Sequence, residues 1–240
     1  MRLAIIGGGR AAWAFGSTWR RIGWPIAGIA TRDETPITAL LNAPRRGIDE
    51  MLDADLILIA VSDSAIREIA DAIPETNAVI WHPSGSLTSM RGGFSLHPLK
   101  ALPPVGEPSD LRDTLLVFEG AHREIAERIA SVAGARFAQI ESENKVRYHA
   151  AAVFASNYVA ALLDIANELI GIDNARADLV ALAESAIENW VKHDDARRFT
   201  GPAARGDRNL IDAHVEVLQP QQELALIYRL LAERILATAK

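Results

Sequence analysis

Residues 2–19 read RLAIIGGGRAAWAFGSTW, an apolar run, a cluster of glycines and a run with helical spacing. This order is typical of a buried strand, a tight turn and a helix. Gly7, Gly9 and Ala12 fit the pattern G-x-G-x-x-G/A, in which glycines allow a sharp turn and a close approach of phosphate to the backbone. The N-terminus of the following helix offers free N–H groups to an anion. We expect a dinucleotide here, bound by Gly7, Gly8, Gly9, Arg10, Ala11 and Ala12; a glycine turn without a ligand is the alternative.

The second expected contact with the dinucleotide follows the apolar run 26–31. An acidic residue at this distance from the glycines usually binds the ribose hydroxyl of NAD. This chain has Thr31, Arg32 and Asp33 there. A guanidinium at Arg32 pairs with the 2′-phosphate that only NADP carries, so we predict NADP, with NAD still possible because of Asp33.

The composition of the 240-residue chain limits its partners and its location. A hydrophobic content of 49% supports a full core, and a net charge of -6 argues against binding nucleic acid. The absence of cysteine excludes disulfides and cysteine–metal sites, fits a reducing compartment, and gives no reason to expect a metal. We find no signal peptide and no apolar stretch of transmembrane length, and therefore expect a cytoplasmic protein that does not bind membranes.

Further candidate residues follow other predicted strands. The apolar run 54–61 is typical of a central parallel strand, and Val61, Ser62 and Asp63 at its end are expected to border the cofactor, or simply to cap the next helix. The runs 78–81 and 94–96 are each followed directly by His-Pro. Ligands bind beyond the carboxyl ends of such strands, so we predict Ser84 and Gly85 as substrate contacts and His97 as a catalytic residue. A structural role for His97 is equally open.

The order of the elements predicts the fold class. Strands and helices alternate up to about residue 141, with 114–118 as an edge strand, which is typical of a doubly wound parallel α/β sheet. The rest reads as all-helical, beginning with one long helix over 144–170. We predict a Rossmann domain over 1–141 and a helical domain for substrate binding and dimerisation over 142–240.

A second group of polar residues opens the helical half. Lys145 and His149 are four residues apart and share one helix face, so an ammonium at Lys145 can donate a proton or polarise a substrate carbonyl during hydride transfer. His149, a second candidate catalytic residue, can do the same or orient the substrate. A solvated helix start is the alternative. Asn157 and Arg205 are further candidates for substrate binding, although the loop with Arg205 can equally be a turn in which Asp207 caps the next helix.

Taken together, the stretches IGGGRAA, TRD, VSD, SGS, SLHPL, KVRYHAAAVFASNY and TGPAARGD resemble the bacterial family in which a Rossmann-like domain precedes a domain of unknown function, DUF2520. That family is similar to the group of 6-phosphogluconate dehydrogenase, β-hydroxyacid dehydrogenases, pyrroline-5-carboxylate reductase and prephenate dehydrogenase. The resemblance implies an NAD(P) domain, a helical domain like that of 6-phosphogluconate dehydrogenase, a cleft between them, and often a dimer. It also implies that Lys145 matches the proton-donating Lys of K-x-x-x-N, whereas His149 replaces the Asn.

These observations favour an NADP-dependent oxidoreductase that transfers a hydride to or from a small carbonyl, hydroxy or imine substrate. A dinucleotide sensor without catalysis is one alternative, because it needs the glycine turn but not Lys145 or His149. An oxidoreductase that uses the deazaflavin F420 is another, since such enzymes share this N-terminal pattern. Alanine-rich helices allow close packing against a partner subunit, so we expect a homodimer through the helical domain; packing within the chain is the alternative.

Overall fold

The computed structural model describes residues 1–238. It divides into two compact units, Met1–Tyr158 and Val159–Lys240. The first 3-10 turn and helix after the last strand belong to the first unit, because side chains at their start contact the sheet. The predicted boundary at residue 141 lies close to the end of the last strand, whereas the boundary between the two compact units follows Tyr158.

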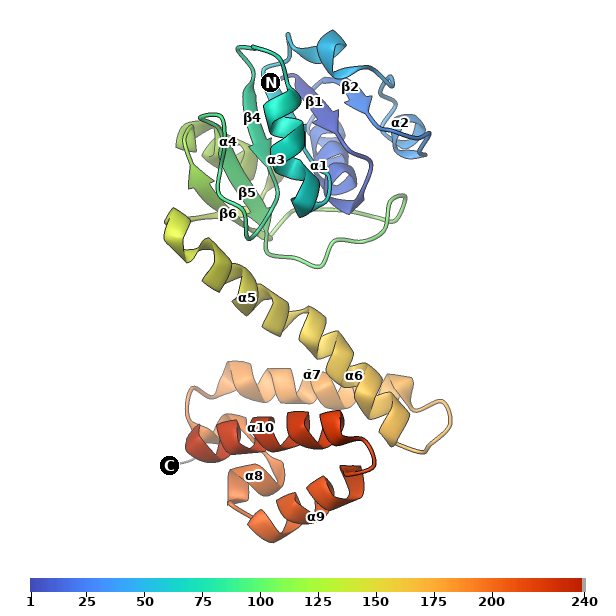
Figure 1. Ribbon diagram of the computed structural model, residues 1–240, viewed down its shortest axis with the longest axis vertical. Coiled ribbons are helices and arrows are strands. Elements are labelled where there is room, and N and C mark those ends of the chain that lie inside the picture. The colour runs from blue at the N-terminus through green and yellow to red at the C-terminus, as the bar shows by residue number, and fades with distance from the viewer. Residues whose placement is uncertain (239–240) are drawn as a thin grey trace. The chain divides into compact units, whose positions relative to one another are not determined.

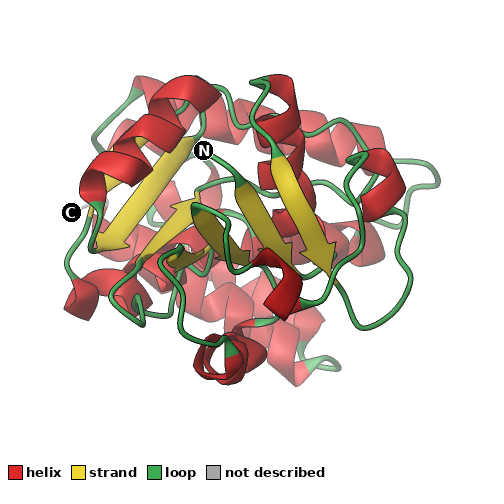
Figure 2. Ribbon diagram, turned by 90° about the horizontal axis from the view of Figure 1, so that it is seen from above, coloured by secondary structure: helices red, strands yellow, loops and turns green. Residues whose placement is uncertain are grey.

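The first unit is a seven-stranded sheet in the order β2-β1-β3-β4-β5-β6-β7 (Figures 1 and 2). The strands are β1 (Leu3–Ile6), β2 (Ile26–Ala30), β3 (Leu56–Ile59), β4 (Val79–His82), β5 (Phe94–Pro98), β6 (Leu115–Gly120) and β7 (Arg136–Gln139). The helices are α1 (Arg10–Arg21), α2 (Ile37–Leu40), α3 (Asp63–Ala72), α4 (Arg123–Ala133) and α5 (Lys145–Ala155), with 3-10 turns at Ile48–Met51 and Ser142–Asn144. The predicted Rossmann fold class is confirmed.

Alternation along the strands places two apolar cores on opposite faces of the sheet. On one face, α1 and α4 pack against residues such as Leu3 and Ile5; on the other, α3 packs against Ala4 and Ile6. The first core contains stacked and edge-on aromatic rings, including Trp19 and Trp81 with centroids 6.3 Å apart. Helices cover both faces of the sheet, so polar residues gather beyond the carboxyl ends of its strands.

Two details of the sheet differ from the expectation. Strands β1 to β5 are mutually parallel, but β6 pairs with β5 in the antiparallel sense, and β7 is parallel to β6. The segment predicted as an edge strand, 114–118, is therefore interior, between β5 and β7. The cause is the connection 99–114, a loop without a crossover helix, which returns the chain in the opposite direction.

The predicted single helix over 144–170 is divided in two. Helix α5 ends at Ala155 and α6 (Asn157–Leu169) follows, because Ser156 adopts φ -128° and ψ -78°. The run Ser142–Leu169 is long and apolar enough to meet the length and composition of a membrane span, contrary to the expectation that no stretch does. Side chains at its start are hydrogen-bonded to strand residues: Ser142 to Glu119, Lys145 to Ser95 and Tyr148 to His97.

The second unit is helical throughout its described part. Its further elements are α7 (Arg176–Lys192), a 3-10 turn at Ala196–Arg198, α8 (Gly201–Arg205), α9 (Arg208–Leu218) and α10 (Gln222–Thr238). A small apolar core joins α8, α9 and α10 around Ile211 and Leu236. Asp207 caps α9 by accepting a hydrogen bond from the Leu210 N–H at 3.2 Å, which confirms the capping alternative for this loop.

Candidate functional site

The glycine turn joins β1 to α1 and borders an open space. Gly7 has φ +114°, and a Cβ there would lie 2.2 Å from the Ala60 carbonyl oxygen, so its glycine is required by the neighbouring strand. A Cβ on Gly9 would meet nothing within 4 Å, so the space above it is open. Gly9 is also the N-cap of α1, and no side chain caps that helix. The helix N-terminus therefore presents uncapped N–H groups to this open space.

The loop after β2 carries Thr31 and Arg32, which the sequence analysis predicts as cofactor-binding residues. Arg32 is exposed there and Thr31 is half-buried. A residue that the sequence did not single out, Arg45, donates from one guanidinium nitrogen to the carbonyl oxygens of Thr31 at 3.0 Å and Arg32 at 2.7 Å. Arg45 thus holds the loop and adds a second positive charge beside Arg32.

The residues after β3 connect this edge to the next loop. Val61 and Ser62 lead into α3, and Ser62 occupies its N-cap position without a capping hydrogen bond from its side chain. The Asp63 carboxylate accepts hydrogen bonds from the hydroxyls of Ser84 at 2.8 Å and Ser86 at 3.0 Å. Asp63 therefore fixes the loop after β4, which was not foreseen.

Lys145, the first residue of α5, is fully buried at 1% exposure. Its Nζ donates to the Ser84 carbonyl oxygen at 3.0 Å and to Ser95 Oγ at 2.6 Å. Ser95 in turn donates to the Glu119 carboxylate at 3.1 Å. Burial lowers the pKa of Lys145 to about 8, although Glu119 and Asp63 oppose that change by favouring the charged form.

Glu119 is the buried acceptor at the centre of this network. It receives hydrogen bonds from Ser142 Oγ at 2.7 Å and from the Ser89 backbone N–H at 2.7 Å. Burial by itself would raise its pKa, but these donors outweigh burial and leave the pKa below its ordinary value. The carboxylate therefore ties β6, the loop after β4 and the entry to α5 together.

His97 and His149 meet above Gly85. Their rings are 5.9 Å apart and nearly perpendicular. A Cβ on Gly85 would lie 2.5 Å from His149 Cδ2 and 3.1 Å from His97 Nε2, so only glycine admits both imidazoles. The Nδ1 atom of His97 lies 2.7 Å from the hydroxyl of Tyr148, another residue that the sequence analysis missed. Burial, with the charges of His149 and Lys145, lowers the pKa of His97 to about 4.

Five of the predicted residues are thus brought together by β4, β5 and α5: Ser84, Gly85, His97, Lys145 and His149. They lie at the same sheet edge as the glycine turn, with β4 two strands from β1, which is about 10 Å at the usual strand spacing. Asn157 is exposed at the start of α6, where its side-chain oxygen accepts a hydrogen bond from Ser156. Arg205 is exposed at the end of α8 in the second unit.

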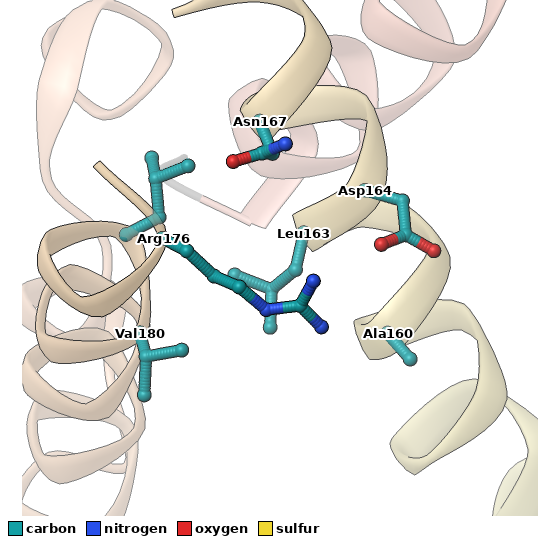
Figure 3. Close-up of a pocket in the computed structure, with 7 residues that line it drawn as sticks. Ala160, Leu163, Asp164, Asn167, Arg176 and Val180 are labelled. Atoms are coloured by element: carbon teal, nitrogen blue, oxygen red, sulfur yellow. The ribbon is translucent and has the colours of Figure 1, made fainter. Parts of the chain in front are cut away.

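The second unit has a small cavity of its own, of about 190 Å³, between α6 and α7. Figure 3 shows Arg176 extending from α7 toward the α6 residues Leu163 and Asp164. The cavity is lined by apolar side chains, by Asn167 and by the charged groups of Asp164 and Arg176. None of the predicted site residues lines this cavity.

The family model for a domain of unknown function, DUF2520, matches residues 116–235, which is half of the chain. The chain belongs to the DUF2520 family. The match starts in β6 and runs through the helices, so it includes Glu119, Lys145, Tyr148 and His149. No curated protein matches this DUF2520 chain.

Solved structures share the fold of this DUF2520 chain over nearly its whole length. A Bacteroides fragilis protein described as a "putative NADP oxidoreductase" is 22% identical with a TM-score of 0.82, covering 98% of each chain. A Thermotoga maritima protein is 23% identical with a TM-score of 0.75, covering 99% of this chain and 98% of its own. A reductive aminase from Aspergillus terreus, solved with NADPH and ethyl-5-oxohexanoate, is 13% identical with a TM-score of 0.69. This match covers 97% of this chain and 92% of the aminase chain.

Proposed function

We propose that the chain is an NADP-dependent oxidoreductase that reduces a small carbonyl or imine compound, or oxidises the corresponding alcohol or amine. The observation that carries this proposal is the position of two features on one sheet edge. The open space above Gly9 lies at the end of β1, and the cluster of His97, Lys145 and His149 lies beside β4 and β5. Structural relatives with this fold include an aminase in complex with NADPH, which supports the choice of cofactor.

The residues of the first unit fit NADP. Gly9 leaves room for a pyrophosphate, and the uncapped N-terminus of α1 supplies N–H donors to it. Arg32 is exposed after β2, where a 2′-phosphate lies in such folds, and Arg45 holds its backbone in place. When bound, the reduced cofactor supplies the hydride that the protein itself lacks. We therefore favour NADP over NAD.

The cluster around Gly85 is proposed to serve the proton that accompanies the hydride. Lys145, with its pKa lowered to about 8 by burial, is suited to acid–base chemistry near neutral pH. An ammonium has three N–H donors, and Ser84 and Ser95 accept two of them. The third remains for a substrate atom, with His149 one turn further along the same helix face. Because Lys145 is only 1% exposed, it can contact a substrate directly only after the Ser84–Gly85 loop shifts.

The decisive test is a screen of keto acids and cyclic imines for oxidation of NADPH, combined with calorimetry of NADPH, NADH and reduced F420. Turnover with NADPH and its loss by about 10²–10⁴-fold in Lys145→Met, with unchanged NADPH affinity, is the expected result. Tight NADPH binding without any turnover favours a sensor. Preferential binding of the deazaflavin would contradict the choice of cofactor.

We also propose that a second copy of the chain covers the apolar surface of the second unit. Several large apolar side chains there are mostly exposed, among them Val217 at 78%, Val191 at 72%, Leu182 at 67% and Trp190 at 65%. Large apolar side chains that are exposed on neighbouring helices are the kind of surface that a protein–protein interface covers. Light scattering at micromolar concentration should give the mass of a dimer, and Val191→Glu should shift it toward the monomer. A monomeric wild-type chain would contradict this proposal. The cytoplasmic location expected from the sequence stays a prediction.

A further inference from the structure

Tyr148 lies on α5 between the two residues that the sequence singled out, and its side chain turns to His97 on β5. The phenolic oxygen is 2.7 Å from His97 Nδ1, and the two rings are nearly perpendicular, with centroids 5.6 Å apart. Within residues 1–238, His97 is the single hydrogen-bond partner recorded for this hydroxyl. The two side chains therefore form a pair that joins the helix to the sheet.

The direction of this hydrogen bond follows from the protonation of the two groups. Burial raises the pKa of Tyr148 to about 12, so the phenol keeps its proton at neutral pH. Burial and the neighbouring charges of His149 and Lys145 lower the pKa of His97 to about 4, so its imidazole is neutral and has one N–H and one lone pair. A phenol is a better donor than acceptor, hence the Tyr148 hydroxyl donates to Nδ1. The proton of His97 must then be on Nε2.

The Nε2 edge of His97 faces the loop after β4. A Cβ on Gly85 would lie 3.1 Å from Nε2, so no side chain of that loop residue covers this nitrogen. The groups that act on His97 are Tyr148, His149 and Lys145 from α5 and the carboxylate of Asp63 from α3. Of these, Tyr148 alone is hydrogen-bonded to the ring among the described residues.

We propose that Tyr148 is a positioning residue, whose hydroxyl fixes His97 in the tautomer that presents Nε2–H to the substrate. This proposal rests on the proposed oxidoreductase function and narrows its substrate class. A fixed N–H donor pairs with an atom that accepts a hydrogen bond: a carbonyl oxygen, a hydroxyl oxygen or the nitrogen of an unprotonated imine. The opposite tautomer would present a lone pair and would select a protonated iminium. His97 donates the hydrogen bond and keeps its proton, so it polarises the reacting bond as a neutral group.

The test needs neither substrate nor cofactor. Long-range ¹H–¹⁵N NMR of the uniformly ¹⁵N-labelled full chain distinguishes the two tautomers of each histidine, and His97→Asn identifies the His97 signals. The wild-type ring is expected as the Nε2–H tautomer at pH 7. Tyr148→Phe keeps the aromatic ring but removes the donor, so the His97 nitrogen shifts should move toward a mixture of tautomers. Loss of a donor to the neutral form should also move the acid titration of His97 to higher pH.

A second tyrosine–histidine pair, Tyr228 and His214, provides a matched control. In the second unit, the Tyr228 hydroxyl lies 2.6 Å from His214 Nδ1, so Tyr228→Phe should change the His214 signals and leave those of His97 alone. An Nδ1–H tautomer in the wild type overturns the proposal, and so do His97 shifts that are unchanged in Tyr148→Phe. If Tyr148→Phe does not fold, the wild-type tautomer decides alone. Failure of NADPH turnover would instead contradict the proposed function, and the two results are independent.

Discussion

Lys145 and Glu119 share one hydrogen-bond partner, the hydroxyl of Ser95, which lies 2.6 Å from the Nζ atom and 3.1 Å from Oε2. The ammonium and the carboxylate are therefore linked without direct contact, and both are buried. Because burial dominates the pKa of Lys145, the charge costs free energy in the folded state even beside this acceptor. This cost gives a measurable dependence of stability on pH.

The stability of the wild type should rise relative to Lys145→Met as pH increases from about 8 to 10.5. In this range the folded chain has lost the Lys145 proton while the unfolded chain still binds it, so the free energy of unfolding increases with pH. A fall in pKa from 10.5 to about 8 corresponds to ~3 kcal/mol over the whole range. Urea titrations at successive pH values measure it, with the exposed Lys192→Met as control. Parallel curves for wild type and Lys145→Met would show that the ammonium is not desolvated.

Substitutions at two glycines of the same turn, Gly9 and Gly7, should have different effects. Gly9→Val places a side chain in space that is open in the structure, at φ -89° and ψ -169°, so the fold should survive while calorimetry detects no NADPH binding. Gly7→Val places a Cβ 2.2 Å from the Ala60 carbonyl at φ +114°, so it should lower the melting temperature instead. Unchanged NADPH affinity in a folded Gly9→Val protein would remove the basis for the cofactor site.

Arg32→Ala should change the preference between cofactors. Its guanidinium is expected to bind the 2′-phosphate, so NADPH affinity should fall roughly 10- to 100-fold, the equivalent of one hydrogen bond to a charged group, while NADH affinity stays the same. Arg229→Ala, an exposed change in the second unit, is the control. An equal loss of affinity for NADPH and NADH would mean that Arg32 binds a group that both cofactors carry.

Gly85→Ala should separate chemistry from cofactor binding. The added methyl would lie 2.5 Å from His149 Cδ2, so His149 and His97 must move apart. With a substrate from the screen, turnover should fall by about 10²-fold, the usual effect of a displacement of ~1 Å, with NADPH affinity retained. Thr88→Ala, in the same loop and exposed, should be silent. Wild-type turnover in Gly85→Ala would exclude the imidazole pair from the chemistry.

The parts of the fold that sequence predicts are those decided by neighbouring residues. The turn at Gly7–Ala12 and the buried strand at Leu56–Ile59 depend on local glycine chemistry and on unbroken apolar runs. The reversal of β6 was missed because it depends on the path of the 99–114 loop, which has no periodic pattern. The break at Ser156 was missed because serine inside an alanine-rich run gives no stop signal.

The same distinction holds for the site. Lys145 and His149 could be proposed together because helix geometry alone puts them on one face. Tyr148 could not be paired with His97, since their hydrogen bond joins residues 51 positions apart in the chain. Glu119 looks like any strand carboxylate in the sequence, and only the meeting of Ser89, Ser95 and Ser142 around it shows its role.

The distribution of the tryptophans makes the chain its own fluorescent reporter. Trp13, Trp19, Trp24 and Trp81 all belong to the first unit, which leaves the exposed Trp190 as the single indole of the second. Trp13 is in the first turn of α1, with its indole N–H donating to the Glu107 carbonyl at 2.8 Å. NADPH bound at the glycine turn should therefore quench Trp13 by energy transfer to its reduced nicotinamide. In Trp190→Phe this quenching should persist, whereas any blue shift that accompanies an increase in protein concentration should disappear. One spectrometer can thus follow ligand occupancy and self-association separately, without a label.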